Sequence, residues 1–214
     1  MKRIVILLFF VLLLTIIAFY LYRTAYTTSS PVNINTELKN NKSDNHTIKV
    51  LHSKAILAKQ FSKKNNYNEQ ICFLIDMKVR SGAERFFVYD LKGDSVITSG
   101  VVTHGRCNER WLVGRRYGNE IGCGCTSLGK YKIGNAYNGR FGLAYKLHGL
   151  ESSNNKAFER FVVLHAHKCV PENEVWSEIC QSDGCPTVSP GFLQQLKKFI
   201  NKSRQPVLLW IYES

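Results

Sequence analysis

The pattern of apolar and polar residues changes three times along the chain. Residues 1–23 contain a long uncharged, apolar run, and residues 24–46 are rich in Ser, Thr, Asn and Lys. From about residue 47 to 64, apolar residues recur at helical spacing, which predicts an amphipathic helix. The pattern then changes to short apolar or alternating runs, which predict strands. We therefore expect an N-terminal apolar segment, a polar linker and one folded domain over residues 47–214.

The domain contains seven segments with the composition of strands. They are rich in aromatic and β-branched residues and are separated by Gly- and Asn-rich stretches. Ser189 followed by Pro190 predicts the start of a second helix, which carries an apolar stripe. These elements predict a mainly β, α+β fold. The predicted strands cover residues 72–79, 85–91, 96–103, 130–133, 144–147, 161–165 and 207–212.

The N-terminal apolar run has the length of a membrane anchor. Residues 4–22, if helical, would span about 28 Å, close to the thickness of the hydrocarbon layer. Lys2 and Arg3 precede the run, and cations of this kind stay on the cytoplasmic side. No convincing small-x-small cleavage site follows. We expect an uncleaved, single-pass inner-membrane anchor with an extracytoplasmic, periplasmic domain; cleavage would instead give a secreted protein.

The charge of the chain favours anionic partners. It contains 29 Lys and Arg against 16 Asp and Glu, a formal net charge of +13. Such a surface associates with nucleic acid, membrane lipid or anionic cell-wall polymer. The basic residues are scattered singly or in pairs such as Lys63-Lys64, without a basic run that would follow a phosphate backbone. Nucleic acid is therefore not an expected partner.

Seven cysteines in an exported chain leave at least one thiol unpaired. If Cys185 is the unpaired thiol, the other six permit up to three disulfides in any of fifteen connectivities. The sequence leaves this pairing open. The six are Cys72, Cys107, Cys123, Cys125, Cys169 and Cys180.

Cys185 and His165 form the candidate catalytic pair. The apolar run at residues 161–167 predicts a strand that ends near His165, and Ser182-Asp183-Gly184-Cys185 comes about 20 residues later. A thiol becomes a nucleophile when a neighbouring imidazole accepts its proton. Gly184 allows close approach of a substrate carbonyl, and free N–H groups in the turn at residues 183–185 can stabilise an oxyanion. The alternation of strand side chains places His167 on the same face as His165, which makes His167 a rival base.

A strand that ends in His, followed about 20 residues later by Ser-x-Gly-Cys, resembles the murein L,D-transpeptidase catalytic domain. Residues 85–105, with Val-Tyr-Asp-Leu-Lys and Val-Val-Thr-His-Gly, are similar to one branch of such proteins, as are residues 126–131 and 147–151. The resemblance covers about residues 71–212. It implies a β-sandwich with peripheral helices and the site in a cleft at one edge.

The resemblance also implies a reaction. The cysteine attacks the carbonyl between the third residue of a peptidoglycan stem peptide and the terminal D-alanine, and an amine of a neighbouring stem then resolves the acyl-enzyme. Water as acceptor gives carboxypeptidase action. By position, the resemblance implies that Cys185 is the nucleophile and His165 is the base. It also implies that a backbone carbonyl near Ala166 orients the imidazole. Gly184 and Ser182 match the glycine and the serine of the family motif. No cofactor is implied.

Two positions depart from the family pattern. Asp183 stands where many members carry His or an aromatic residue, and Thr187 stands at or near the position where many carry Arg. A carboxylate beside a thiol raises the thiol pKa, which opposes activation. These departures bear on substrate preference and on activity.

Further residues are candidates for the substrate-binding cleft. We place His167 and Asp183 there, and also His104, His148 and Tyr145. As an alternative, the two Gly-flanked histidines are turn residues, and the strand tyrosine packs in the core. The spacing His165-x-His167-x-Cys169, with Cys123-x-Cys125, imitates a zinc site. In an exported chain we expect disulfides instead of a metal. Three functional hypotheses remain: an acyl-transfer enzyme, a non-catalytic peptidoglycan-binding relative, and a disulfide- or zinc-stabilised structural envelope domain.

Overall fold

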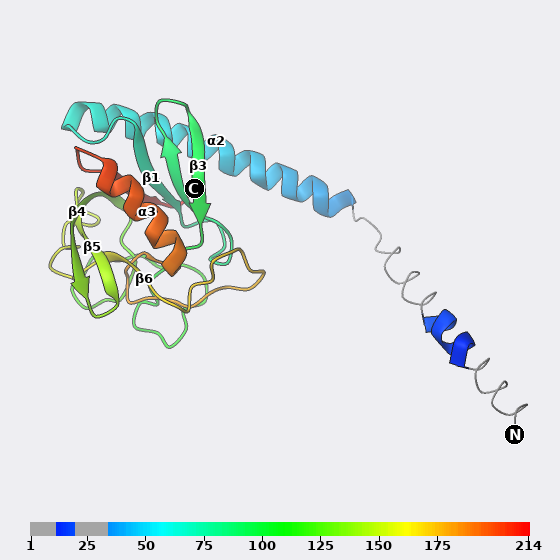
Figure 1. The fold of residues 1–214 in the computed structure, drawn as a ribbon. Coiled ribbons are helices and arrows are strands. Elements are labelled where there is room, and N and C mark those ends of the chain that lie inside the picture. The colour runs from blue at the N-terminus through cyan, green and yellow to red at the C-terminus, as the bar shows by residue number, and fades with distance from the viewer. Residues whose placement is uncertain (1–11, 20–33) are drawn as a thin grey trace, which may run out of the picture. The chain divides into compact units, whose positions relative to one another are not determined.

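The computed structural model describes residues 12–19 and 34–214 (Figure 1). The contacts divide the chain into residues 1–45 and residues 46–214. Residues 12–19, the part of the predicted membrane anchor that the structure describes, are helical. The rest of the predicted anchor lies outside the described residues. Within the described part of the chain, no helix is both long enough and apolar enough to cross a membrane.

Helix α2 (Ile34–Asn65) contains the predicted helix of residues 47–64 but begins earlier. The last part of the expected polar linker, residues 34–46, is therefore helical. Neither Gly nor Pro occurs between residues 32 and 65, so no residue type that breaks a helix interrupts this stretch. Leu51, Ala55 and Ala58 form the buried stripe of the helix.

Eight strands form one sheet, in the order β3-β2-β1-β8-β4-β5-β6-β7. The seven predicted strand segments all contain strands, and the eighth, β7, was missed because it has only two residues. The strands are β1 (Ile71–Asp76), β2 (Phe86–Asp90), β3 (Ser95–Gly100), β4 (Gly129–Gly139), β5 (Gly142–Gly149), β6 (Val163–Ala166), β7 (Thr187–Val188) and β8 (Leu208–Tyr212).

The prediction of a mainly β, α+β domain is confirmed, but the expected sandwich of two sheets is replaced by one continuous sheet. β8 pairs in parallel with β1 on one side and antiparallel with β4 on the other, so the strand ladder is not interrupted. Leu209 and Ile211 face a core that contains α3, whereas Leu208 and Trp210 face a core that contains α2. β8 is buried on both faces, as expected for a strand covered by helices on both sides.

Helix α3 (Pro190–Lys202) begins where the sequence predicts. The Ser189 hydroxyl accepts a hydrogen bond from Phe192 N at 3.2 Å, and Pro190 occupies the first turn. Phe192, Leu193 and Leu196 are buried in the core on that face. The helix therefore covers the sheet and begins directly after β7.

Two disulfides form, Cys107–Cys125 and Cys169–Cys180. Cys72, Cys123 and Cys185 are free thiols. Cys72 is buried in β1, where strand pairing and core packing surround it. The structure thus contains two of the three possible disulfides and leaves Cys185 unpaired.

We expect Leu196→Ala to lower the free energy of unfolding by about 2–5 kcal/mol, because it leaves a cavity where a fully buried side chain packs on the sheet. Urea denaturation followed by circular dichroism measures the change. Lys197→Ala, at the exposed neighbouring position of the same helix, should change the stability by less than about 0.5 kcal/mol. Equal losses in the two variants would contradict the assignment of α3 to the core.

Candidate active site

Strands β6 and β7 bring Cys185 and His165 to the same side of the sheet edge. His165 lies opposite Thr187 in the parallel pair, and Cys185 precedes Thr187 by two residues. The Cys185 Sγ accepts a hydrogen bond from Val163 N at 3.4 Å, and Val163 precedes His165 by two residues. Cys185 lies in the turn that precedes β7, beside the strand that carries His165. Cys185 and His165 accordingly line one cavity of about 330 Å³.

The His165 ring is held by hydrogen bonds at both nitrogens. Its Nδ1 lies 3.2 Å from the Ala166 carbonyl oxygen, which can only accept, so Nδ1 carries the hydrogen. Its Nε2 lies 3.0 Å from Thr187 Oγ1 and therefore accepts the hydroxyl proton. The side chain is 7% exposed, and burial lowers the pKa of His165. The imidazole is thus neutral near pH 7 and oriented as a base.

The Cys185 thiol rests away from this imidazole. Its Sγ lies 3.8 Å from the Phe161 carbonyl oxygen, in addition to its contact with Val163 N. Burial raises the pKa of Cys185, although the Val163 N–H and the Arg160 charge oppose this change. Among the described residues, the Cys185 thiol and the His165 ring each have other hydrogen-bond partners and form no hydrogen bond with each other. The resting pair is therefore a protonated thiol and a neutral imidazole.

The turn before Cys185 is shaped by Ser182 and Gly184. Ser182 Oγ donates to the Cys185 carbonyl oxygen at 2.7 Å and accepts from Gly184 N at 3.2 Å. Gly184 has φ +105°, a conformation that favours glycine. A Cβ on Gly184 would lie 2.5 Å from the Cys125 carbonyl oxygen. Both the backbone angle and the space therefore require glycine at this position.

Two arginines from distant parts of the chain flank this turn. Arg106 Nε donates to Asp183 Oδ1 at 2.7 Å, so an ion pair accompanies the aspartate that would otherwise oppose thiolate formation. The Asp183 side chain is 73% exposed, and its effect on the Cys185 pKa is the smallest of the four causes. Arg160 Nη2 donates to the Cys125 carbonyl oxygen at 2.6 Å. Nothing near Cys185 in the sequence indicates either arginine.

His167 and Phe141 complete the wall of the cavity. His167 lies there as predicted, with its Nδ1 accepting from Cys169 N at 3.1 Å. Phe141, at the turn between β4 and β5, stacks on His165 with ring centroids 5.0 Å apart and meets His167 edge-on at 5.5 Å. Phe141 was not among the predicted site residues, although an aromatic residue in a hairpin turn flanked by glycines could have indicated it.

The structure does not bring the other predicted binding residues to this cavity. His104 is buried, with its ring nitrogens 3.4 Å from guanidinium nitrogens of Arg85 and Arg115. Tyr145 is buried in the core on β5, and His148 stacks on Phe158 with centroids 4.9 Å apart. Burial beside the arginines, core packing and ring stacking thus place His104, Tyr145 and His148, respectively, away from this cavity.

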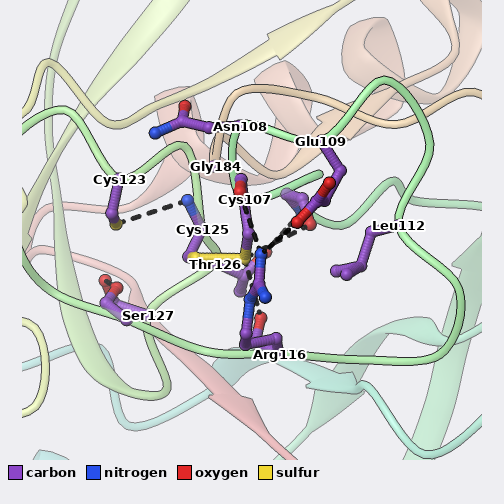
Figure 2. Close-up of a disulfide and its surroundings, with 12 residues drawn as sticks. Cys107, Asn108, Glu109, Leu112, Arg116, Cys123, Cys125, Thr126, Ser127 and Gly184 are labelled. Carbon is purple, nitrogen blue, oxygen red and sulfur yellow. Dashed lines mark hydrogen bonds and ion pairs between the residues drawn. A yellow bond between two sulfur atoms is a disulfide. The ribbon is translucent and has the colours of Figure 1, made fainter.

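The histidine and cysteine spacing that imitates a zinc site does not form one. Cys169 is bonded to Cys180, and Cys125 is bonded to Cys107, as Figure 2 shows for the second pair. Over residues 12–19 and 34–214, no three His, Cys, Asp or Glu side chains converge in a way that would hold a metal ion.

Comparison with known proteins identifies relatives. The family model described as the L,D-transpeptidase catalytic domain matches residues 42–212. No curated protein matches the chain. Similar solved structures include the Ldtfm-avibactam carbamoyl enzyme, at 11% identity and a TM-score of 0.43, covering 69% of this chain and 50% of that one.

Two further structures give a similar result. An L,D-transpeptidase from Mycobacterium smegmatis is 10% identical with a TM-score of 0.39, covering 67% of this chain and 58% of that one. A mutant of the helical cell shape determining protein Pgp2 from Campylobacter jejuni is 12% identical with a TM-score of 0.40, covering 76% of this chain and 56% of that one. The chain thus spans 50–58% of the length of these three proteins. All three TM-scores are below 0.5, so the assignment of the chain to a family rests on the family match alone.

The resting thiol predicts a pH profile for alkylation. Because burial raises the pKa of Cys185, the rate of its reaction with iodoacetamide should rise with a midpoint above about pH 8.5, the usual value for a free cysteine. The rate is measured by mass spectrometry on Cys123→Ser, so that the partly exposed Cys123 does not react, with a cysteine-containing tripeptide as reference. A plateau already reached at pH 7 would show instead that the thiolate–imidazolium pair exists at rest.

The burial of His104 predicts sensitivity to acid. Burial and the charges of Arg115 and Arg85 lower the pKa of His104 to about 3, whereas an unfolded histidine titrates near 6.5. The unfolded state therefore binds one more proton between these values, and stability should fall by up to about 1.4 kcal/mol per pH unit as the pH decreases. Urea denaturation at pH 4, 5 and 7 measures this slope, which should be smaller in His104→Gln. An unchanged slope in the variant would assign the acid sensitivity to other groups.

Proposed function

Because the chain belongs to the L,D-transpeptidase catalytic domain family, we propose that it is a cysteine acyl-transfer enzyme acting on peptidoglycan stem peptides. The observation that carries the proposal is the convergence of His165, from β6, and Cys185, from the turn before β7, in one cavity. The two disulfides agree with the extracytoplasmic location of such a substrate. A membrane anchor in residues 1–23 would hold the domain near the cell wall.

The reaction begins with transfer of the thiol proton. Rotation about χ1 of Cys185 turns Sγ from the Phe161 carbonyl toward His165, and Nε2 accepts its proton in place of the Thr187 hydroxyl. The Ala166 carbonyl stabilises the resulting imidazolium through Nδ1–H. Hydrogen bonds of catalytic pairs are often long or unformed in the free enzyme, so the resting geometry is compatible with this step.

The thiolate then attacks the carbonyl of the bond that joins the third stem residue to D-alanine. The tetrahedral intermediate collapses, the imidazolium gives its proton to the departing amine, and a thioester remains on Cys185. The amine of a second stem attacks this thioester and forms the cross-link while His165 accepts the proton of the amine. The bond to Cys185 Sγ breaks, and the departing thiolate takes this proton from His165. If water attacks instead, the product is a shortened stem with a free carboxylate.

The turn offers N–H groups for the oxyanion. Among the described residues, the N–H groups of Asp183 and Cys185 have no hydrogen-bond acceptor, whereas Gly184 N–H is bonded to Ser182 Oγ. Two N–H groups directed at a developing negative charge form the usual oxyanion hole. This arrangement supports the roles of Ser182 and Gly184 as residues that shape the turn.

Arginines from other segments supply positive charge near the turn, where Thr187 stands at or near the position of the family arginine. The Arg160 guanidinium opposes the rise in the pKa of Cys185, and Arg106 forms an ion pair with Asp183. Substrate that covers the cavity would exclude water and strengthen the effect of both charges. His167 and Phe141, on the cavity wall, then contact the stem peptide.

One observation favours a second candidate function, a non-catalytic peptidoglycan-binding relative. Burial raises the pKa of Cys185, and His165 Nε2 is occupied by Thr187. If substrate does not turn the thiol toward the imidazole, the cavity binds stems without reacting.

Incubation of the full chain with tetrapeptide muropeptides or a carbapenem, followed by peptide mass spectrometry, should reveal an acyl adduct on Cys185. The adduct should be absent in Cys185→Ala. His165→Ala should lower the turnover of muropeptides by about 10²–10⁴-fold, because it removes the base. His167→Ala should have a smaller effect.

The possible outcomes separate the two functions. Binding of muropeptides without an adduct would favour the non-catalytic relative. Equal losses of turnover in His165→Ala and His167→Ala, with both variants folded by circular dichroism, would contradict the assignment of the base.

A further inference from the structure

Three cysteines lie behind the turn that carries Cys185. Cys107 and Cys125 form a disulfide, and Cys123 is free (Figure 2). Cys125 N–H donates to Cys123 Sγ at 3.4 Å. A Cβ placed on Gly118 would lie 3.4 Å from Cys123 Sγ and 3.5 Å from Cys125 Sγ, so both sulfur atoms border the same point. A free thiol therefore lies beside the disulfide.

A backbone hydrogen bond joins Cys107 to the segment that carries both Cys123 and Cys125. Cys107 N–H donates to the Gly124 carbonyl oxygen at 3.0 Å, and Gly124 is the residue between Cys123 and Cys125. Gly124 has φ +62°, a conformation that glycine adopts without strain. Cys123 is partly exposed to solvent, and Leu112 packs with the three cysteines in a small cluster.

One end of the disulfide supports the catalytic turn through Cys125. The Cys125 carbonyl oxygen accepts a hydrogen bond of 2.6 Å from Arg160 Nη2. The same oxygen is the atom that a Cβ on Gly184 would meet at 2.5 Å. Cys125 is therefore one of the groups that hold Arg160 near Cys185, together with the Gly118 carbonyl and Ser127, and its carbonyl leaves no room for a side chain at position 184.

The other end supports the turn through Arg106, the neighbour of Cys107. Arg106 N–H donates to the Ser182 carbonyl oxygen at 2.8 Å, and its side chain is paired with Asp183. The disulfide thus joins the two segments that hold the turn from either side. Few regular elements occur in these segments to hold them by backbone pairing.

We propose that Cys107, Cys123 and Cys125 form a thiol–disulfide exchange site that sets the reactivity of Cys185. The Cys123 thiolate attacks Cys107 Sγ, the Cys107–Cys123 bond forms, and the Cys107–Cys125 bond breaks. Cys125 leaves as a thiolate and takes up a proton, which replaces the proton lost by Cys123. The exchange has no net oxidation or reduction, so it requires no external oxidant.

The exchange releases the Cys125 side chain from Cys107, so that its carbonyl can shift relative to Arg160, which also donates to the Gly118 carbonyl oxygen and to Ser127 Oγ. Such a shift weakens the hold on a positive charge that favours the Cys185 thiolate. A further rise in the Cys185 pKa lowers the thiolate fraction and with it the alkylation rate below the pKa, for which we expect a change of about threefold. This effect acts on the thiol itself, whatever substrate the thiol attacks.

Labelling of the full chain tests the exchange. Free thiols are alkylated with iodoacetamide after incubation in a buffer of reduced and oxidised glutathione, and the disulfides are then reduced and labelled with N-ethylmaleimide. Fragmentation of the tryptic peptide of residues 117–130 shows which label each of its two cysteines carries. We expect both arrangements, with the first label on Cys123 in some molecules and on Cys125 in others. The first label on Cys123 alone under all glutathione ratios would overturn the proposal.

Two variants with the same number of free thiols test the effect on Cys185. Cys123→Ser can form only the Cys107–Cys125 disulfide, and Cys125→Ser only the Cys107–Cys123 disulfide. We expect Cys185 in Cys125→Ser to react with iodoacetamide about threefold more slowly near neutral pH than in Cys123→Ser. Circular dichroism and thermal melts establish that both are folded.

Equal alkylation rates, or a free Cys107 in folded Cys125→Ser, would overturn the proposal. If Cys125→Ser does not fold, the alkylation rate of Cys185 is compared in the two labelled populations of the wild-type protein. Because alkylation requires no muropeptide, these results are independent of the acyl-transfer activity.

Discussion

The parallel pairing of β6 with the two-residue strand β7 is the constraint on which the site depends. This short ladder sets His165 opposite Thr187 and places Cys185 beside Val163. Two residues of pairing would be weak alone, but β6 also pairs with β5, and α3 begins immediately after β7 with a capped first turn. Packing of α3 on the sheet therefore holds the strand that positions the nucleophile.

Burial of the site determines its resting chemistry. Removal of water from Cys185 and His165 disfavours both charged forms, which raises the pKa of the thiol and lowers that of the imidazole. The two effects favour a neutral pair, so the ion pair needed for attack has to be stabilised by nearby charge and by substrate. The Arg160 charge, which opposes the rise in the Cys185 pKa, therefore bears on the proposed chemistry.

The sequence predicted those features that local pattern controls. The strand that ends near His165, the loop that carries Cys185 and the Ser189–Pro190 start of α3 all follow from periodicity and capping, and all lie where expected. His104, His148 and Tyr145 were placed in the cleft because residue type alone suggested binding, whereas burial and stacking give them other surroundings. Phe141 and Arg160 were missed because their roles arise from contacts between segments far apart in the chain.

The cysteine pairing shows why such contacts matter in this fold. Residues 101–128 and 167–186 surround the site yet contain few backbone ladders, so side chains and disulfides must determine their shape. Arg106, the neighbour of Cys107, is bonded to Ser182 and Asp183. The Cys125 carbonyl accepts from Arg160 and lies close to Gly184. The Cys107–Cys125 disulfide joins these two segments. A loop held by a disulfide can take a different arrangement for each cysteine that pairs with the same partner. The free thiol of Cys123 therefore gives the site a second arrangement that a loop held by strand pairing would not have.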